Sequence, residues 1–143
     1  MSDTSGKAAA AASRLGLSAG DIVGEVGYDD DVDEALRAAI EAAAGSELID
    51  GSADEVFDAV LLWWRADDGD LTDELVDVST VLADDGVVLL ATPRPGFSGF
   101  VDAAEVNDAA DTAGLGRPSS GQPAGDWVVA KLTRSKLPNK ARR

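Results

Sequence analysis

The sequence contains no cysteine and no histidine. Without cysteine, the chain has no disulfide, no thiolate nucleophile and no zinc site built on thiolates. Without histidine, it lacks the commonest general base and the commonest metal ligand in proteins. These two absences exclude hydrolases that use a Ser-His-Asp triad or a Cys-His pair.

Long apolar runs are absent as well. The N-terminus lacks the apolar region of a secretory signal peptide, and no apolar run approaches the roughly 20 residues that span a membrane. We therefore expect a cytoplasmic protein that makes no contact with a membrane. Hydrophobic residues nevertheless make up 45% of the 143 residues, which is enough for the core of one domain.

Basic residues are scarce outside the end of the chain. The net charge is −15, and half of the 12 basic residues lie in a segment, 131–143, that contains no acid. They are Lys131, Arg134, Lys136, Lys140, Arg142 and Arg143. Residues 1–130 therefore carry 27 acidic and 6 basic side chains. Because a body this acidic repels nucleic acid phosphates, we expect any nucleic acid contact to involve the basic segment only.

Strand-like and helix-like patterns alternate along the chain. Apolar runs predict strands over 21–26, 46–50, 59–64, 87–92 and 126–132. Apolar stripes with helical spacing predict helices over 31–44, 71–82 and 102–113. Strands separated by helices of this length indicate a three-layer, Rossmann-like α/β fold with a mostly parallel sheet.

Two helices begin with pairs of acids that are typical of a capping box. The pairs are Asp31 with Glu34 and Asp102 with Glu105. They predict that the two helices start at Asp31 and Asp102.

The C-terminal end of the sheet departs from the alternating pattern. No helix separates the last two strands, so residues 115–120 should pair antiparallel with 126–132 at one edge. We expect a disordered lead-in over 1–17, one domain over 18–132 and a flexible basic tail over 133–143.

This order of elements resembles the class I methyltransferase variant of the Rossmann fold over residues 18–132. In that family an E-x-G-x-G-x-G loop follows the first strand, and an acidic residue that ends the second strand holds the ribose of S-adenosylmethionine. Glu25, Gly27 and Asp50 match these positions. The resemblance implies that these three residues would hold such a cofactor.

Two glycine positions of that loop are filled by Asp29 and Asp31. Their carboxylates would repel the carboxylate of the cofactor by about 1 kcal/mol each near the surface. Their Cβ atoms would also crowd it. We therefore expect no cofactor and a degenerate form of the methyltransferase fold.

Two other stretches carry a closer resemblance. Gly-Tyr-Asp-Asp-Asp-Val-Asp at 27–33 and Trp-Trp-Arg at 63–65 are similar to a small, largely actinobacterial family of unknown function, DUF3052. This resemblance implies the degenerate methyltransferase-like fold and a cytoplasmic protein, and it assigns no activity.

The acids Asp29, Asp31 and Asp33 also have the D-x-D-x-D spacing that begins an EF-hand loop. The glycine position of such a loop is Glu34 and its bidentate glutamate position is Ile40, so calcium binding of this type is not expected. A looser Mg²⁺ or Mn²⁺ site built from the same carboxylates and Glu25 stays open. We favour the interpretation that these acids satisfy amide groups at a helix N-terminus.

Trp63 and Trp64 end the central strand and face opposite sides, so each should pack under one helical layer. Ligands of open α/β sheets bind beyond the carboxyl ends of the strands. There we expect a ligand or partner crevice formed by Tyr28, Trp64, Arg65 and Arg94. An aromatic ring beside two arginines would suit an acidic or planar group.

Three hypotheses on function follow. We favour a non-catalytic interaction or regulatory module that binds another protein, because the loop is filled with acid and histidine and cysteine are missing. The first alternative is a small methyltransferase-like enzyme, or a sensor of nucleotides or S-adenosylmethionine. The second is a protein that binds nucleic acid or an acidic protein through its basic tail, in a salt-sensitive manner.

Overall fold

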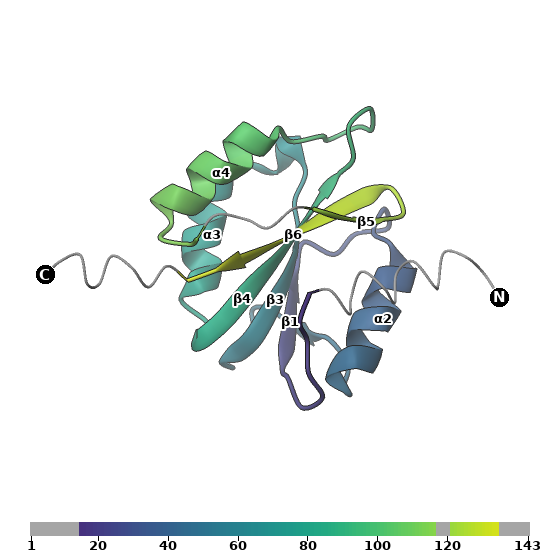
Figure 1. The fold of residues 1–143 in the computed structure, drawn as a ribbon, viewed down its shortest axis with the longest axis vertical. Helices are drawn as coiled ribbons and strands as arrows, with labels where there is room; N and C mark the ends of the chain where they lie inside the picture. The colour runs from purple at the N-terminus through teal and green to yellow at the C-terminus, as the bar shows by residue number, and fades with distance from the viewer. Residues whose placement is uncertain (1–14, 117–120, 135–143) are drawn as a thin grey trace, which may run out of the picture.

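The computed structural model describes residues 15–116 and 121–134, which form one sheet with helices on both faces (Figure 1). The strand order is β2-β1-β3-β4-β6-β5. The strands are β1 (Val23–Val26), β2 (Ile49–Asp50), β3 (Phe57–Trp63), β4 (Leu82–Pro93), β5 (Gln122–Ala124) and β6 (Trp127–Thr133). The first four are parallel, and β6 is antiparallel to both β4 and β5. The predicted mostly parallel sheet with an antiparallel edge pair is confirmed.

The helices form the outer two of three layers. Helix α2 (Glu34–Ala44) covers one face of the sheet, and α3 (Leu71–Ser79) and α4 (Ala103–Thr112) cover the other (Figure 1). A 3₁₀ turn, η1 (Ala66–Asp68), follows β3. No helix in the described part of the chain is both long and apolar enough to cross a membrane.

Each face of the sheet has its own hydrophobic core, and one tryptophan lies in each. Trp63 packs with Leu36 of α2, whereas Trp64 packs with Leu75 of α3. This confirms the prediction that Trp63 and Trp64 pack under opposite layers. Alternation of side chains along β3 places them there.

Both predicted capping boxes are wrong. Helix α2 starts two residues later than expected, because the cap is Asp33, which accepts a hydrogen bond from the amide of Ala35 at 3.0 Å. Asp31 is drawn away from the helix by an ion pair with Arg65. Asp102 is the N-cap residue of α4, so the predicted start of this helix is confirmed, although the Asp102 side chain makes no capping hydrogen bond.

The antiparallel edge is built from a different segment than 115–120. The partner of β6 is β5, to which it is joined through Gly125 and Asp126. Gly125 has φ +63°, a conformation that suits a tight hairpin. Leu115 forms a single bridge with Arg134, and residues 117–120 lie outside the described residues. The short turn decides the pairing because it holds 122–124 directly beside β6.

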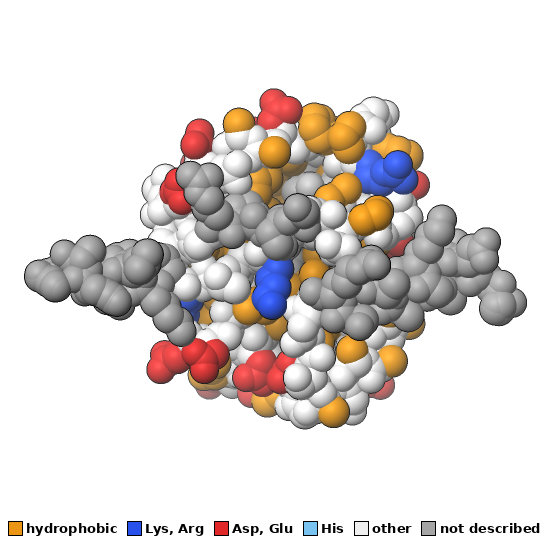
Figure 2. Space-filling view, viewed as in Figure 1, with side chains coloured by type: hydrophobic (Ala, Val, Ile, Leu, Met, Phe, Trp, Pro, Cys, Tyr) orange, Lys and Arg blue, Asp and Glu red, His pale blue; other side chains and the backbone are white. Residues whose placement is uncertain are grey.

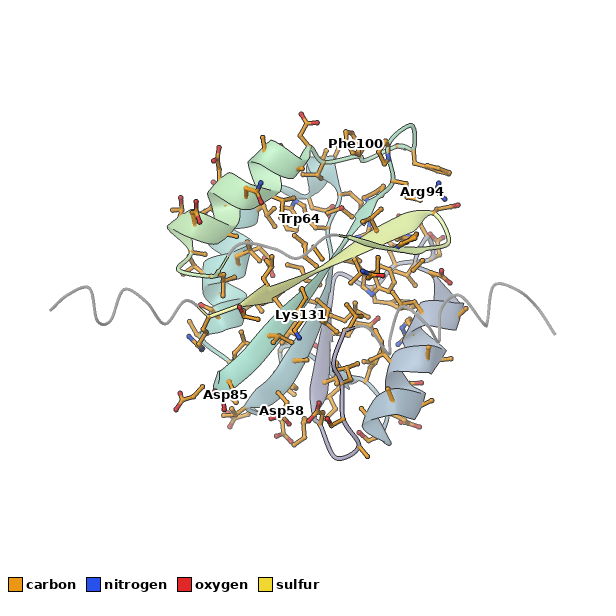
Figure 3. All side chains as sticks on the ribbon, in the orientation of Figure 1. Asp58, Trp64, Asp85, Arg94, Phe100 and Lys131 are labelled. Atoms are coloured by element: carbon orange, nitrogen blue, oxygen red, sulfur yellow. The ribbon has the colours of Figure 1, made fainter. Side chains whose placement is uncertain are left out.

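The domain is slightly longer at both ends than 18–132. Leu15 is only 2% exposed and lies in the core on the α2 side. Lys131 lies within β6 (Figure 3), and Arg134 donates to the carbonyl of Ser79 at 2.7 Å. These contacts place residues 15–17 and 133–134 in the domain, while the rest of the predicted lead-in and tail lies outside the described residues.

The connection between β2 and β3 contains no helix. Residues 51–56 alone join the two strands, which lie on either side of β1. The side chains of Ile22, Val26 and Ile49 face the α3 side of the sheet and are only partly buried there. The short connection therefore leaves this part of the sheet incompletely covered.

Candidate functional site

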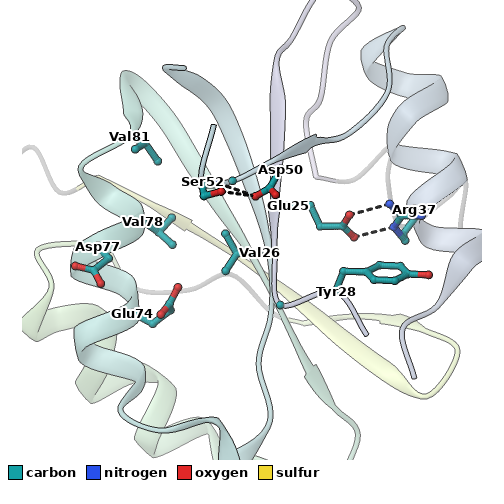
Figure 4. Close-up of a pocket in the computed structure, with 12 residues that line it drawn as sticks. Glu25, Val26, Tyr28, Arg37, Asp50, Ser52, Glu74, Asp77, Val78 and Val81 are labelled. Atoms are coloured by element: carbon teal, nitrogen blue, oxygen red, sulfur yellow. Dashed lines mark hydrogen bonds and ion pairs between the residues drawn. The ribbon is translucent and has the colours of Figure 1, made fainter. Parts of the chain in front are cut away.

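A groove of about 730 Å³ lies between the ends of β1 and β2 and the flank of α3 (Figure 4). We call it the β1–α3 groove. It brings together the three residues of the predicted cofactor site, Glu25, Gly27 and Asp50, with Tyr28 beside them. The structure thus places these sequence-predicted residues around one cavity.

The groove has an apolar part and an acidic surround. Its apolar part is formed by Val26 of β1 and by Val78 and Val81 at the end of α3. Four carboxylates and one guanidinium complete its charged lining: Glu25, Asp50, Glu74, Asp77 and Arg37. The excess of carboxylates favours a cationic occupant over an anionic one.

Glu25 is bound on both carboxylate oxygens by groups of the protein itself. Its carboxylate accepts two hydrogen bonds from Arg37, at 2.7 and 2.8 Å, and one from the indole of Trp63 at 2.8 Å. Only 8% of the side chain is exposed, and the same pair raises the pKa of Arg37. Glu25 therefore ties α2 to the sheet, and a ligand would have to displace Arg37 to reach it.

Gly27 is required by the packing of the chain itself. It has φ +85°, and a Cβ atom at this position would overlap the carbonyl oxygen of Trp63. In methyltransferases a glycine of this loop lets the backbone approach the cofactor. Here Gly27 lets the end of β1 approach the end of β3. A glycine in this loop is thus explained without a bound ligand.

Tyr28 covers the Glu25–Arg37 pair from the outside. Its ring lies 4.7 Å from the guanidinium carbon of Arg37, and its hydroxyl donates to Glu34 at 2.9 Å. The hydrogen bond to Glu34 raises the pKa of Tyr28. Tyr28 lines the groove and is 53% exposed.

Asp50 ends β2 at the mouth of the groove. It accepts hydrogen bonds from the amide of Ser52 at 2.9 Å and from its hydroxyl at 2.8 Å. These bonds lower the pKa of Asp50. An exposed, ionised carboxylate at this point adds to the attraction for cations.

The acidic loop 27–33 is fastened to the domain by Arg65. The guanidinium binds the carboxylate of Asp31, donates to the carbonyl of Gly27 at 3.0 Å and lies 5.2 Å from the ring of Trp127. The indole of Trp127 donates to the carbonyl of Asp31 at 3.0 Å. Arg65 therefore connects the loop 27–33 with the end of β3 and the start of β6.

The three candidate metal ligands are directed to different partners. Asp29 accepts from the amide of Asp30, Asp31 pairs with Arg65, and Asp33 caps α2. No three carboxylates within residues 15–116 and 121–134 are grouped closely enough to hold a metal ion. The arrangement of these carboxylates therefore adds no support for a Mg²⁺ or Mn²⁺ site in this loop, which stays a hypothesis.

The predicted crevice forms only in part. Tyr28, Trp64 and Arg65 line a hollow of about 300 Å³ beyond β1 and β3. Trp64 is only 5% exposed, however, and Arg94 lies away from it, donating to the carbonyl of Gly125 at 3.2 Å (Figure 3). An aromatic ring flanked by two free arginines is therefore not present, because each arginine is bound to the protein's own oxygens.

Arg37 and Trp127 are two of the residues of this region that the sequence interpretation missed. Residues 1–130 contain only 6 basic side chains, so an arginine within a helix of an otherwise acidic body is itself a signal. Trp127 begins a confident strand but lies 96 residues from its hydrogen-bond partner Asp31. No local pattern connects residues so far apart.

We expect Asp31→Asn to destabilise the protein at neutral pH and not in acid. Arg65 lowers the pKa of Asp31 in the folded state, so this ion pair stabilises the fold above the unfolded pKa of about 4 and is lost as pH falls through the folded value. Because Asp31 is half exposed, the loss at pH 7 should be about 0.5 to 1 kcal/mol. Urea unfolding from pH 7 down to pH 3 measures it.

Asp29→Asn is the matched control for this prediction. It removes the same charge from the same loop, but among the described residues its carboxylate accepts a hydrogen bond only from the adjacent amide of Asp30. An equal, pH-independent loss in both variants would contradict the role of the Asp31–Arg65 pair.

The fold is similar to those of solved methyltransferases. The mitomycin 7-O-methyltransferase matches with a TM-score of 0.64 and 16% identity, over 93% of this chain and 53% of that enzyme. A SAM-dependent methyltransferase of Aquifex aeolicus matches with a TM-score of 0.59 and 13% identity, over 86% and 87%. The chain thus spans about half the length of the first enzyme. At this identity the similarity establishes the predicted methyltransferase-like fold alone.

Sequence similarity gives the closer relationship. The chain is 47% identical over 125 residues to an uncharacterized protein of Mycobacterium tuberculosis, covering 87% of this chain and 78% of the relative. The family described as "Protein of unknown function (DUF3052)" matches residues 12–136. The chain therefore belongs to the DUF3052 family, as its glycine-tyrosine-aspartate and double-tryptophan stretches indicate.

Proposed function

We propose that this protein is a non-catalytic binding module that keeps a methyltransferase-like fold and uses the β1–α3 groove to bind another protein. The observation that carries the proposal is that Glu25 accepts three hydrogen bonds from Arg37 and Trp63. The carboxylate at the position that matches the cofactor loop therefore holds α2 against the sheet.

The residues around the loop do not fit S-adenosylmethionine. Asp29 and Asp31 stand at the two substituted glycine positions, and Asp31 is fixed there by Arg65. The carboxylate of the cofactor would meet these acids, while Arg37 and Arg65 are both engaged in ion pairs. Like charges and crowding both oppose binding in this orientation.

The charge of the groove indicates the chemistry of the partner. With four carboxylates and one paired guanidinium in its lining, the groove should attract lysine and arginine side chains. Three valines offer an apolar contact in the same place. A short basic segment that also carries an aliphatic residue matches both properties.

The second candidate function is a sensor of S-adenosylmethionine or a small methyltransferase. It is favoured by one observation, the gathering of Glu25, Gly27 and Asp50 around a single cavity. The sulfonium and ammonium groups of that cofactor are cationic and would suit these carboxylates. This candidate requires Arg37 to leave Glu25.

Titration of the purified protein with S-adenosylmethionine separates the two candidates. We expect no saturable heat in calorimetry and no rise in melting temperature at millimolar concentrations. A ligand present at about 100 times its Kd would stabilise the fold by about 2.7 kcal/mol, which is readily measured. Such stabilisation would support the sensor and contradict the proposed function.

Affinity capture with matched charge reversals tests whether a protein partner binds in the groove. We expect a partner retained by the wild type to be lost with Glu74→Lys and Asp77→Lys in the groove. The control reverses Glu105 and Asp108 of α4, which have the same spacing and lie outside the groove. Equal retention by both variants would contradict binding through the groove.

A further inference from the structure

The direction in which the chain crosses the sheet decides on which face each connection lies. From β1 to β2 the chain passes toward one edge of the sheet, and α2 covers one face (Figure 1). From β3 to β4 it passes in the opposite direction, and α3 covers the other face. Both arrangements follow from the right-handedness of connections between parallel strands.

The connection from β2 to β3 runs in the same direction as that from β3 to β4. A right-handed crossover here would therefore place its helix on the α3 face, above β1. Such a crossover usually takes about a dozen residues or more, whereas residues 51–56 form a short connection without a helix. Within residues 15–116 and 121–134, the α3 layer thus has no helix beside α3 on the β1 side.

Apolar side chains stay partly exposed at this position. We call them the apolar strip: Ile22, Val26, Ile49 and Val81. All four pack against the core on the α3 side and are only partly buried. Neighbouring strands lie about 4.8 Å apart and packed helices about 8 to 10 Å apart, so β1 and β2 together offer the width of about one helix.

Acids lie on both sides of the apolar strip. Glu74 and Asp77 of α3 lie on one side, and Asp50 at the end of β2 lies on the other (Figure 4). None of these three carboxylates takes part in an ion pair within the described chain. Burial, followed by the charge of Asp77, raises the pKa of Glu74, so a cation placed here would relieve an unfavourable environment.

We propose that an amphipathic helix of another protein, with an aliphatic stripe between two rows of lysine or arginine, docks on the apolar strip beside α3. The inference rests on the proposed function in treating the β1–α3 groove as a protein-binding surface, and it names the conformation and chemistry of the partner segment. The helix takes the position that the β2–β3 connection leaves without one. Its aliphatic stripe buries the apolar strip, and its cations lie against the acids on either side.

A helix suits this surface better than an extended segment. An extended segment binds by adding a strand to an open sheet edge through backbone hydrogen bonds. The edge strand here, β2, has only two residues, Ile49 and Asp50. A helix satisfies most of its backbone groups internally and needs from the surface only an apolar contact with charges beside it.

Apolar contact, rather than charge, selects this position. Acids also gather along the lower rim of the face shown in Figure 2. A second hollow, of about 600 Å³ between α3 and α4, is lined by Asp70, Glu105 and Asp108 as well. Its apolar residues Leu71 and Ala109, however, are buried. The second hollow therefore serves as an internal comparison for the docking position.

Two synthetic peptides test the conformation of the partner segment. The first, about 14 residues or four helical turns long, carries leucines at helical spacing, lysines on both sides of them and alanines elsewhere. The second replaces two of the alanines by proline, which keeps every leucine and lysine but breaks the helix. We expect the first peptide to bind at least about tenfold more tightly and to become helical on binding, as measured by fluorescence titration and circular dichroism.

Amide chemical shifts of the isotope-labelled full-length protein locate the first peptide. We expect changes at Val26, Ile49 and Val81. Glu74→Gln with Asp77→Asn should weaken binding by about five- to tenfold. Glu105→Gln with Asp108→Asn removes two charges at the same spacing on α4 and should leave the affinity unchanged.

A second variant tests the apolar contact without changing charge. Val26→Thr with Ile49→Thr keeps the β-branched shape that suits a strand and should weaken binding of the first peptide by about tenfold. Urea unfolding of each variant shows whether the domain is intact.

Three results would overturn the inference: equal binding of the two peptides, shift changes at the hollow between α3 and α4 instead of the apolar strip, or no saturable binding of the first peptide at millimolar concentration. Equal binding that is lost with Glu74→Gln and Asp77→Asn would leave the groove as a protein-binding surface and remove only the helix. The proposed function fails by a different result, stabilisation by S-adenosylmethionine, whatever the peptides do.

Discussion

Gly27→Ala should lower the free energy of unfolding by about 3 kcal/mol. Two effects add at this position. The backbone has φ +85°, which a residue with a Cβ atom adopts at a penalty of about 1 to 2 kcal/mol. The new methyl group would also overlap the carbonyl oxygen of Trp63, and relief of that overlap requires β1 and β3 to separate.

Comparison with Gly45→Ala separates the overlap with Trp63 from the backbone penalty. Gly45 has φ +80°, close to that of Gly27, but no atom lies within 4 Å of a Cβ atom built there. We expect a loss of only about 1 kcal/mol for this control. Urea unfolding followed by tryptophan fluorescence gives both values. Equal losses would mean that Trp63 does not hold Gly27, and the glycine would again need a ligand to explain it.

The buried strands and the positions of the helices could be predicted because their signals are local. The apolar run that became β3 is unbroken, and the stripe of Leu36 and Ile40 repeats at helical spacing. Alternation along a strand also fixed opposite faces for Trp63 and Trp64. Such patterns need no knowledge of distant residues.

The start of α2 and the internal contacts of the site could not be predicted because they depend on contacts between distant residues. Asp31 and Asp33 are equally good caps by type, and only Arg65, 34 residues away from Asp31, decides between them. With 27 acids available to few bases, sequence alone does not say which carboxylate Arg37 selects. The same holds for Trp127, whose partner precedes it by 96 residues.

This difference has a consequence for degenerate members of a fold family. Glu25, Gly27 and Asp50 match the positions of a cofactor site and do surround one cavity. Contacts within the protein nevertheless explain two of these residues: Glu25 binds Arg37, and Gly27 packs against the carbonyl of Trp63. A motif that persists for packing reasons is therefore weak evidence for the ligand that the motif binds elsewhere.

Glu25→Gln should destabilise the protein by about 2 to 3 kcal/mol. Glutamine keeps an acceptor for the indole of Trp63 but loses the charge that binds Arg37 through two nitrogens. The guanidinium, whose side chain is only 23% exposed, would then lack a buried counter-charge. Urea unfolding at pH 7 measures the loss.

Glu34→Gln is the control that separates the two partners of Arg37. Glu34 also pairs with this arginine, at 3.0 Å, but its side chain is 60% exposed, so its loss should destabilise the protein far less than the loss of Glu25. A loss at Glu25 several times larger would establish that the carboxylate matching the cofactor loop is a structural anchor. If both variants lost the same small amount, Glu25 would be free to exchange Arg37 for a cationic ligand, and the sensor function would become the better explanation of the groove.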